Sequence, residues 1–174
     1  ACNILRADEI YRKTHSLIKK SGTNDPFIIA SDNNIMIRSS TDFRELKGLY
    51  TIIKRKRIII INENLSDENK KLICAHEIGH DMLHREFAKN KIMHDYALCC
   101  MSAKTECEAN MFAADLLISD DEISELVYDG YDINQISKII CCDLNLVGIK
   151  LYGMNLRGYD FHLDTITTKN FLTI

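Results

Sequence analysis

The spacing of apolar residues at the start of the chain predicts two helices. Apolar side chains recur at helical intervals from residue 4 to residue 20, and Ser21-Gly22 is expected to end that helix. Asn24-Asp25-Pro26 can begin a short second helix that reaches Ala30, because proline is well suited to the first helical position.

Three short apolar segments after these helices predict a small sheet. They are rich in β-branched residues and cover positions 35–37, 49–53 and 58–61. Lys54-Arg55-Lys56-Arg57 joins the last two, and we interpret these basic residues as a solvent-exposed hairpin tip rather than a nucleic-acid site. An edge of this sheet could accept an extended peptide as an additional strand.

The second half of the chain carries mainly helical patterns. One helix is expected from Ser66 to about His84, and residues 85–101 lack periodicity and are expected to form a loop. The sequence therefore predicts an α+β fold in a single domain, 1–174, with a small N-terminal sheet of about three strands packed on a mainly helical body. A further helix is expected from Ser102 or Thr105 to Ile118. A helical C-terminal part (120–152) follows, with expected helices at 120–128, 132–142 and 144–152, and residues 153–174 form a tail.

Composition narrows the class of protein. The 174 residues are 46% hydrophobic and 27% charged, with a net charge of −3, so general affinity for nucleic acid or an anionic membrane is not expected. No apolar run approaches the ~20 residues of a membrane span, and there is no signal-peptide pattern. We therefore expect a cytoplasmic protein.

The cysteines agree with a reducing compartment. There are seven, an odd number, and two adjacent pairs make a poor disulfide framework. Most are interpreted as small buried apolar residues. The alternative is a second metal or redox site built from Cys99, Cys100 and Cys107.

Candidate chemistry is concentrated in the predicted helix that begins at Ser66. His76-Glu77-Ile78-Gly79-His80 has the pattern H-E-x-x-H, and two histidines four residues apart lie on one helical face. They can bind one cation, while Glu77 can accept a proton from water activated by that cation. Chance would produce this pattern in roughly one such chain in a hundred. The alternative is a pair of core histidines hydrogen-bonded to the backbone.

A third metal ligand must come from elsewhere in the chain. Glu106 and Glu108, on the next long helix, are the best candidates, and helical-wheel position does not separate them. Thr105-x-x-Glu108 is also a capping-box pattern, which would give Glu108 a purely structural role. Other polar residues could act as a ligand or polarise the substrate carbonyl. They are His84, His94, Asp95, Tyr96 and His162.

Two segments together resemble the ImmA/IrrE family of metallopeptidases. They are Ala75-His76-Glu77-Ile78-Gly79-His80 and Glu108-Ala109-Asn110-Met111-Phe112-Ala113-Ala114-Asp115-Leu116-Leu117-Ile118. The resemblance covers roughly residues 4–152 and implies a zincin-like domain. Carried over residue by residue, it implies that the zinc ligands are His76, His80 and Glu108 and that the catalytic base is Glu77.

The same resemblance implies a zinc endopeptidase that cleaves a regulatory protein, a transcriptional repressor of a mobile element or stress response. Imidazole and carboxylate ligands accept manganese and iron as well as zinc. Two alternatives remain: a non-catalytic, metal-stabilised module that sequesters a regulator, and a helix-turn-helix DNA-binding protein built on residues 132–152. Only one basic residue, Lys150, lies in the second helix of that motif, which argues against DNA binding.

Overall fold

Two helices precede the sheet, as the apolar spacing predicts. This computed structural model describes residues 4–89 and 103–162, and in it α1 spans Ile4–Ser21 and α2 spans Pro26–Asp32. The Asp25 side chain accepts hydrogen bonds from the first backbone N–H groups of α2, and Pro26 occupies the first turn. The predicted start of this helix is therefore confirmed.

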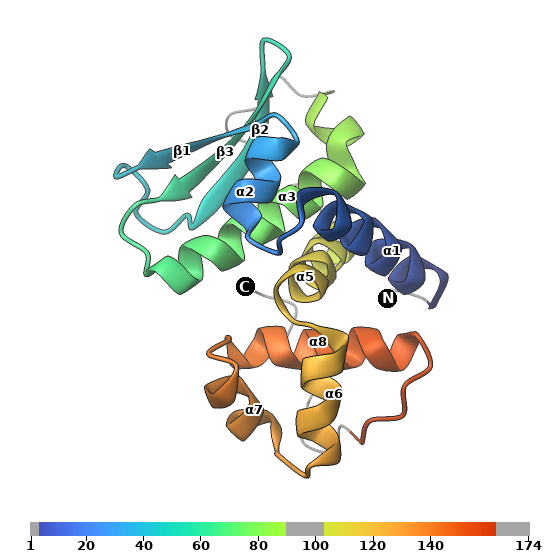
Figure 1. Ribbon diagram of the computed structural model, residues 1–174. Coiled ribbons are helices and arrows are strands. Elements are labelled where there is room, and N and C mark those ends of the chain that lie inside the picture. Colours follow the sequence, from blue (N-terminus) through green and yellow to red (C-terminus); the bar gives the residue numbers. More distant parts are fainter. Residues whose placement is uncertain (1–3, 90–102, 163–174) are drawn as a thin grey trace.

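The sheet has three strands in the order β1-β3-β2 (Figure 1). β1 (Ile35–Ser40) runs parallel to β3 (Lys56–Asn62), and β2 (Gly48–Ile53) runs antiparallel to β3. The register pairs Tyr50 with Ile59. β2 is an edge strand, since β3 is its only strand partner among the described residues.

A two-residue turn joins β2 to β3. Lys54 and Arg55 have φ values of 48° and 66°, the left-handed backbone that a tight hairpin requires. Lys54, Arg55 and Lys56 are exposed, which confirms the predicted hairpin tip. Arg57 differs, because its half-buried guanidinium donates a 2.7 Å hydrogen bond to Asp81 of the next helix.

The helix that carries the H-E-x-x-H pattern packs against β2 and β3 (Figure 1). α3 spans Asp67–Lys89, and the Ser66 hydroxyl accepts a hydrogen bond from a backbone N–H of its first turn. The helix is longer than expected: residues 85–89, predicted as the start of a loop, continue it beyond a non-helical residue at His84 (φ −131°, ψ 17°). The rest of that predicted loop lies outside the described residues.

α5 (Ala103–Leu117) lies between α1, α3 and the C-terminal helices (Figure 1). Because it begins at Ala103, Thr105 lies inside the helix and not at its N-cap, so the capping box considered as an alternative role for Glu108 is wrong. Every residue from Cys107 to Leu116 is buried, so this helix has no solvent-facing side over most of its length.

A close approach between α3 and α5 occurs at Gly79. A Cβ on Gly79 would lie 3.1 Å from Ala109 Cα and 3.2 Å from Phe112 Cβ. These separations are shorter than comfortable van der Waals contact, so glycine at this position allows the two backbones to pack closely. The approach brings the start of α5 next to the two histidines of α3.

Three helices form the C-terminal part, at the opposite end of the molecule from the sheet (Figure 1). α6 spans Asp120–Tyr128, α7 spans Ile133–Ile139, and α8 spans Leu144–Leu156. α7 ends at Ile139, three residues earlier than expected, and Cys141 just beyond it has a left-handed φ of 52°. α8 continues four residues further than expected. Within residues 4–89 and 103–162 no single helix is long and apolar enough to span a bilayer; α7 and α8 pass that test only as a pair, bent by 112°.

Buried ion pairs connect these helices. Lys150 of α8, almost completely buried, lies 2.8 Å from a carboxylate oxygen of Asp115 and 2.6 Å from one of Asp120. Arg157 donates two further hydrogen bonds to Asp120, of 2.7 and 2.9 Å. Since Lys150 is the only basic residue of α8 and is committed to these pairs, it cannot reach a phosphate backbone.

The observed architecture confirms the predicted α+β class: a small three-stranded sheet packed on a mainly helical body, consistent with a zincin-like domain. The core joins both parts. Cys74, Cys141 and Cys142 are free thiols. The largest fully buried apolar side chains are Ile10, Ile29, Ile59, Ile78, Met111, Phe112, Leu116, Ile118, Ile123, Ile136 and Leu146.

Candidate metal centre

The two histidines of the motif lie on the face of α3 that is turned toward α5. Both are buried, and their Nε2 atoms are 3.0 Å apart. This is the expected result of a spacing of four residues on a helix. The structure thus brings His76 and His80 together as the sequence predicts.

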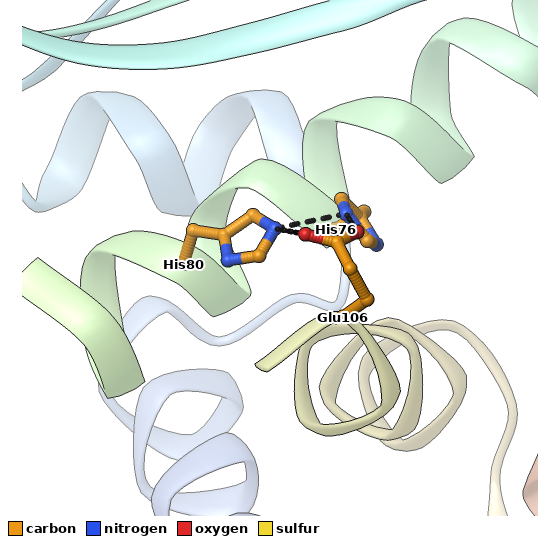
Figure 2. A group of neighbouring side chains, drawn as sticks. All are labelled: His76, His80 and Glu106. Atoms are coloured by element: carbon orange, nitrogen blue, oxygen red, sulfur yellow. Dashed lines mark hydrogen bonds and ion pairs between the residues drawn. The ribbon is translucent and has the colours of Figure 1, made fainter. Parts of the chain in front are cut away.

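The carboxylate that faces these imidazoles belongs to Glu106. Its oxygens lie 3.3 Å from His76 Nε2 and 3.4 Å from His80 Nε2, and Figure 2 shows all three side chains turned toward a common point. Among the described residues, these three form the group whose ligand atoms all lie within 4.8 Å of one another.

Glu108 does not lie with the two histidines, which corrects the ligand implied by the family resemblance. Its carboxylate accepts hydrogen bonds from Arg6 of α1 (2.8 Å) and from His84 Nε2 (3.0 Å). Residues two apart on an α-helix are separated by ~200° around its axis, so Glu106 and Glu108 cannot face the same group. The structure therefore indicates Glu106 as the third ligand.

The three residues fit a tetrahedral metal such as zinc. With metal–ligand bonds of ~2.0–2.1 Å, neighbouring ligand atoms around tetrahedral zinc are separated by ~3.3 Å. The two Nε2 atoms are 3.0 Å apart, and one carboxylate oxygen of Glu106 lies 3.3 Å from His76 Nε2 and the other 3.4 Å from His80 Nε2, so the spacing is similar. Two imidazoles and one carboxylate are a common ligand set of hydrolytic zinc sites, which leave a fourth position for water.

Hydrogen bonds to the Nδ1 atoms of the two imidazoles support this fit. His76 Nδ1 lies 2.7 Å from the side-chain oxygen of Asn110, which accepts its proton and leaves Nε2 free to bind a cation. His80 Nδ1 lies 3.2 Å from His84 Nδ1. The role of Asn110 was not predicted, although its position four residues after Glu106, on the same helical face, was a usable signal.

Electrostatics around the pair favour either a proton or a cation between the imidazoles. Burial alone would lower the pKa of His76, but the carboxylates of Glu106 and Glu77 outweigh it and raise that pKa. Burial would raise the pKa of Glu106, yet the two imidazoles hold it well below its usual range. A metal must therefore compete with protons for this site.

Glu77 lies on the side of α3 that faces β2. It is buried, and the backbone N–H of Tyr50 donates a hydrogen bond to its carboxylate. A Cβ on Gly48 would come within 3.5 Å of Glu77 Oε1, so the edge strand passes directly over this side chain. Burial raises the pKa of Glu77, which makes its carboxylate a better proton acceptor near neutral pH.

The other candidate polar residues do not join the centre. His84 is hydrogen-bonded through both ring nitrogens, to His80 and to Glu108, so neither nitrogen is available to polarise a substrate carbonyl. His162 is exposed. His94, Asp95 and Tyr96 lie outside the described residues, as do Cys99 and Cys100 of the alternative cysteine site.

Comparison of the sequence with known proteins places this chain in a family. A family model described as "IrrE N-terminal-like domain", of a peptidase family, matches residues 30–139, which include every residue of the candidate centre. The chain belongs to the ImmA/IrrE family of metallopeptidases. A protein of Bacillus phage phi105, "Uncharacterized immunity region protein 2", is 35% identical over 121 residues, which are 70% of this chain and 75% of that protein. "Metallopeptidase ImmA" of Bacillus subtilis (strain 168) is 30% identical over 132 residues, which are 74% of this chain and 75% of that protein.

Membership of the ImmA/IrrE family agrees with the centre found in the structure. A metallopeptidase of this family requires a metal and acts on a protein. The matched segment supplies both the H-E-x-x-H helix α3 and the glutamate-bearing helix α5. α1, which contributes Arg6, and α8 lie outside the matched segment.

Proposed function

We propose that this protein is a cytoplasmic zinc endopeptidase that cleaves a regulatory protein, namely a transcriptional repressor. The observation that carries the proposal is the convergence of His76, His80 and Glu106 from two helices, beside a buried Glu77 that faces an edge strand. Zinc is preferred because the ligand set and spacing suit a tetrahedral ion, although manganese or iron would accept the same ligands.

In this proposal, the ligands hold the ion and Glu77 moves the proton. Zinc, when bound, is a Lewis acid that eases deprotonation of water and polarises the scissile carbonyl. Glu77 accepts the proton of the attacking water and then donates it to the leaving amine nitrogen as the C–N bond breaks. Burial raises the pKa of Glu77, which favours the first of these transfers, from water to the carboxylate.

The substrate is proposed to bind along β2 as an additional strand. β2 is an edge strand, and its residues Gly48 and Tyr50 lie against Glu77. A peptide paired with this edge would place a backbone carbonyl beside both Glu77 and the metal ligands. Main-chain pairing of this kind binds many sequences, so side-chain pockets must provide the specificity.

The choice of a repressor as substrate rests on the family resemblance and on the name of one relative, an immunity region protein of a phage. A cytoplasmic location is supported by the free thiols of Cys74, Cys141 and Cys142, because unpaired cysteines are typical of reducing compartments.

The test combines metal analysis with cleavage assays on transcriptional repressors encoded near the gene of this protein. Glu77→Gln should keep the zinc of the purified protein but lose cleavage, because the amide cannot accept the proton. Glu68→Gln, an exposed position at the start of the same helix, is the matched control and should cleave normally.

Unchanged cleavage by Glu77→Gln would remove Glu77 from the mechanism. If the wild-type protein binds such a repressor without cutting it, the molecule is a sequestering module instead.

A further inference from the structure

A line of hydrogen bonds leads from the N-terminal helix to one of the two histidines of the centre. Arg6 Nη2 donates to Glu108 Oε2 at 2.8 Å, and His84 Nε2 lies 3.0 Å from the same oxygen. His84 Nδ1 lies 3.2 Å from His80 Nδ1. Glu108, His84 and His80 are all buried, so water does not compete freely for these contacts.

The chemistry of these groups fixes the direction of each bond. An ionised carboxylate only accepts hydrogen bonds, so the proton between His84 and Glu108 must be on His84 Nε2. A neutral imidazole has a single N–H, which leaves His84 Nδ1 as an acceptor. His80 Nδ1 must then donate to it, and the lone pair of His80 is left on Nε2, the atom that faces Glu106 and His76.

We propose that Glu108 and His84 are positioning residues that hold His80 in the tautomer able to bind the metal through Nε2. This inference rests on the proposed role of His80 as a metal ligand. It also gives a function to the glutamate that the family resemblance assigned to the metal directly: Glu108 acts through His84, and Arg6 fixes the carboxylate from α1.

The two histidines of the centre are thus held by different groups. For His76, the acceptor is the side-chain oxygen of Asn110 on α5. For His80, the acceptor is another imidazole, whose own tautomer depends on Glu108. Without the carboxylate, His84 can carry its proton on Nδ1 and would then favour the wrong tautomer of His80. Loss of such a partner typically weakens metal binding by ~10–100-fold.

The experiment measures zinc affinity by competition with a chromophoric chelator, together with imidazole ¹⁵N shifts of the metal-free protein. His84→Phe removes the acceptor and should weaken zinc binding by ~10–100-fold. His84→Asn can place a side-chain oxygen near the position of Nδ1, so its affinity should return toward that of the wild type. Glu108→Leu should weaken zinc binding as His84→Phe does, and Glu108→Gln, which preserves shape and an acceptor oxygen, should weaken it less.

The ¹⁵N shifts provide a readout that a merely structural role would not change. Wild-type His80 should carry its proton on Nδ1, and His84→Phe and Glu108→Leu should move part of that population to Nε2. Wild-type zinc affinity together with an unchanged His80 tautomer in His84→Phe would overturn the proposal. Complete loss of zinc in Glu108→Gln would also overturn it, because Glu108 would then be a ligand.

These outcomes are distinguishable from those that test the proposed function. Failure of Glu77→Gln to abolish cleavage would count against the peptidase mechanism and leave the zinc affinities of the His84 and Glu108 variants unaffected. Conversely, a wild-type affinity in His84→Phe would count only against the role of this hydrogen-bonded line.

Discussion

Glu106 and Glu108 are separated by one residue on α5, yet their carboxylates face different groups. Glu106 lies 3.3–3.4 Å from the Nε2 atoms of the two motif histidines. Glu108 lies between Arg6 and His84, behind the centre. The half turn of helix between them separates the proposed metal ligand from the residue proposed to position His80.

The first prediction compares these two glutamates. Glu106→Gln should reduce zinc affinity by more than ~100-fold, since it removes the only carboxylate ligand of the group, whereas Glu108→Gln should reduce it by no more than ~10-fold. Equilibrium competition with a zinc chelator measures both. A larger loss in Glu108→Gln than in Glu106→Gln would reverse the assignment made from the structure.

The close approach at Gly79 gives a second prediction. In Gly79→Ala the new Cβ meets Ala109 Cα at 3.1 Å and Phe112 Cβ at 3.2 Å, so α5 must move away and carry Glu106 with it. Overpacking costs ~1–3 kcal/mol and the better helix propensity of alanine returns ~1 kcal/mol, so the free energy of unfolding should fall by ~1 kcal/mol. Zinc affinity should fall as well.

The matched control is Gly153→Ala, in the middle of α8. There the new Cβ meets only the flexible end of Met111, at 3.3 Å. The gain in helix propensity should therefore prevail, with an increase of up to ~1 kcal/mol in the free energy of unfolding and no change in zinc affinity. Urea denaturation of both variants measures the change in the free energy of unfolding. Equal changes in the two variants would show that the close contact at Gly79 does not destabilise the alanine variant.

A third prediction concerns the contact between β2 and α3. The Tyr50 hydroxyl donates a 2.5 Å hydrogen bond to Asp81, a buried carboxylate next to His80. Tyr50→Phe should lower the free energy of unfolding by ~1.5–3 kcal/mol, the usual contribution of a hydrogen bond to a charged group. Tyr128→Phe, at a position 75% exposed, is the control and should change it by less than ~0.5 kcal/mol.

A fourth prediction concerns pH and the buried ion pairs of the C-terminal part. Burial alone would raise the pKa of Asp120, but Arg157 and Lys150 outweigh it and hold that pKa below its usual value of 3.8. A lowered folded-state pKa means that the carboxylate stabilises the fold fully above its unfolded pKa. That contribution is lost as the pH falls through the lower folded value.

The measurement is urea denaturation of the wild type and of Asp120→Asn between about pH 6 and pH 3, a range that spans the ordinary pKa of aspartate. At pH 6 the variant should be less stable by up to ~3 kcal/mol, because Asp115 still neutralises Lys150 in part. The difference should shrink as the pH falls below about 4. A difference that stays constant over this range would contradict the predicted shift.

Much of the local structure follows from the sequence. The apolar spacing predicts α1 and the H-E-x-x-H helix, the acidic residues at 120–122 predict the start of α6, and the β-branched segments predict all three strands. These predictions succeed because helix and strand periodicities are local properties, as are caps such as Asp25. Helix ends were less accurate: α7 stops early, and α3 continues past His84, where no strong terminating residue marks an end.

The sequence by itself also determined that His76 and His80 share a face and that Glu77 is adjacent to them, since four residues is about one helical turn. Only the tertiary structure decided between Glu106 and Glu108. α5 is buried on nearly all sides, so its polarity pattern does not show which face meets α3. That choice depends on the rotation of one helix against another, which is set by the contact of Gly79 with Ala109 and by Arg6 from a helix about a hundred positions earlier in the chain.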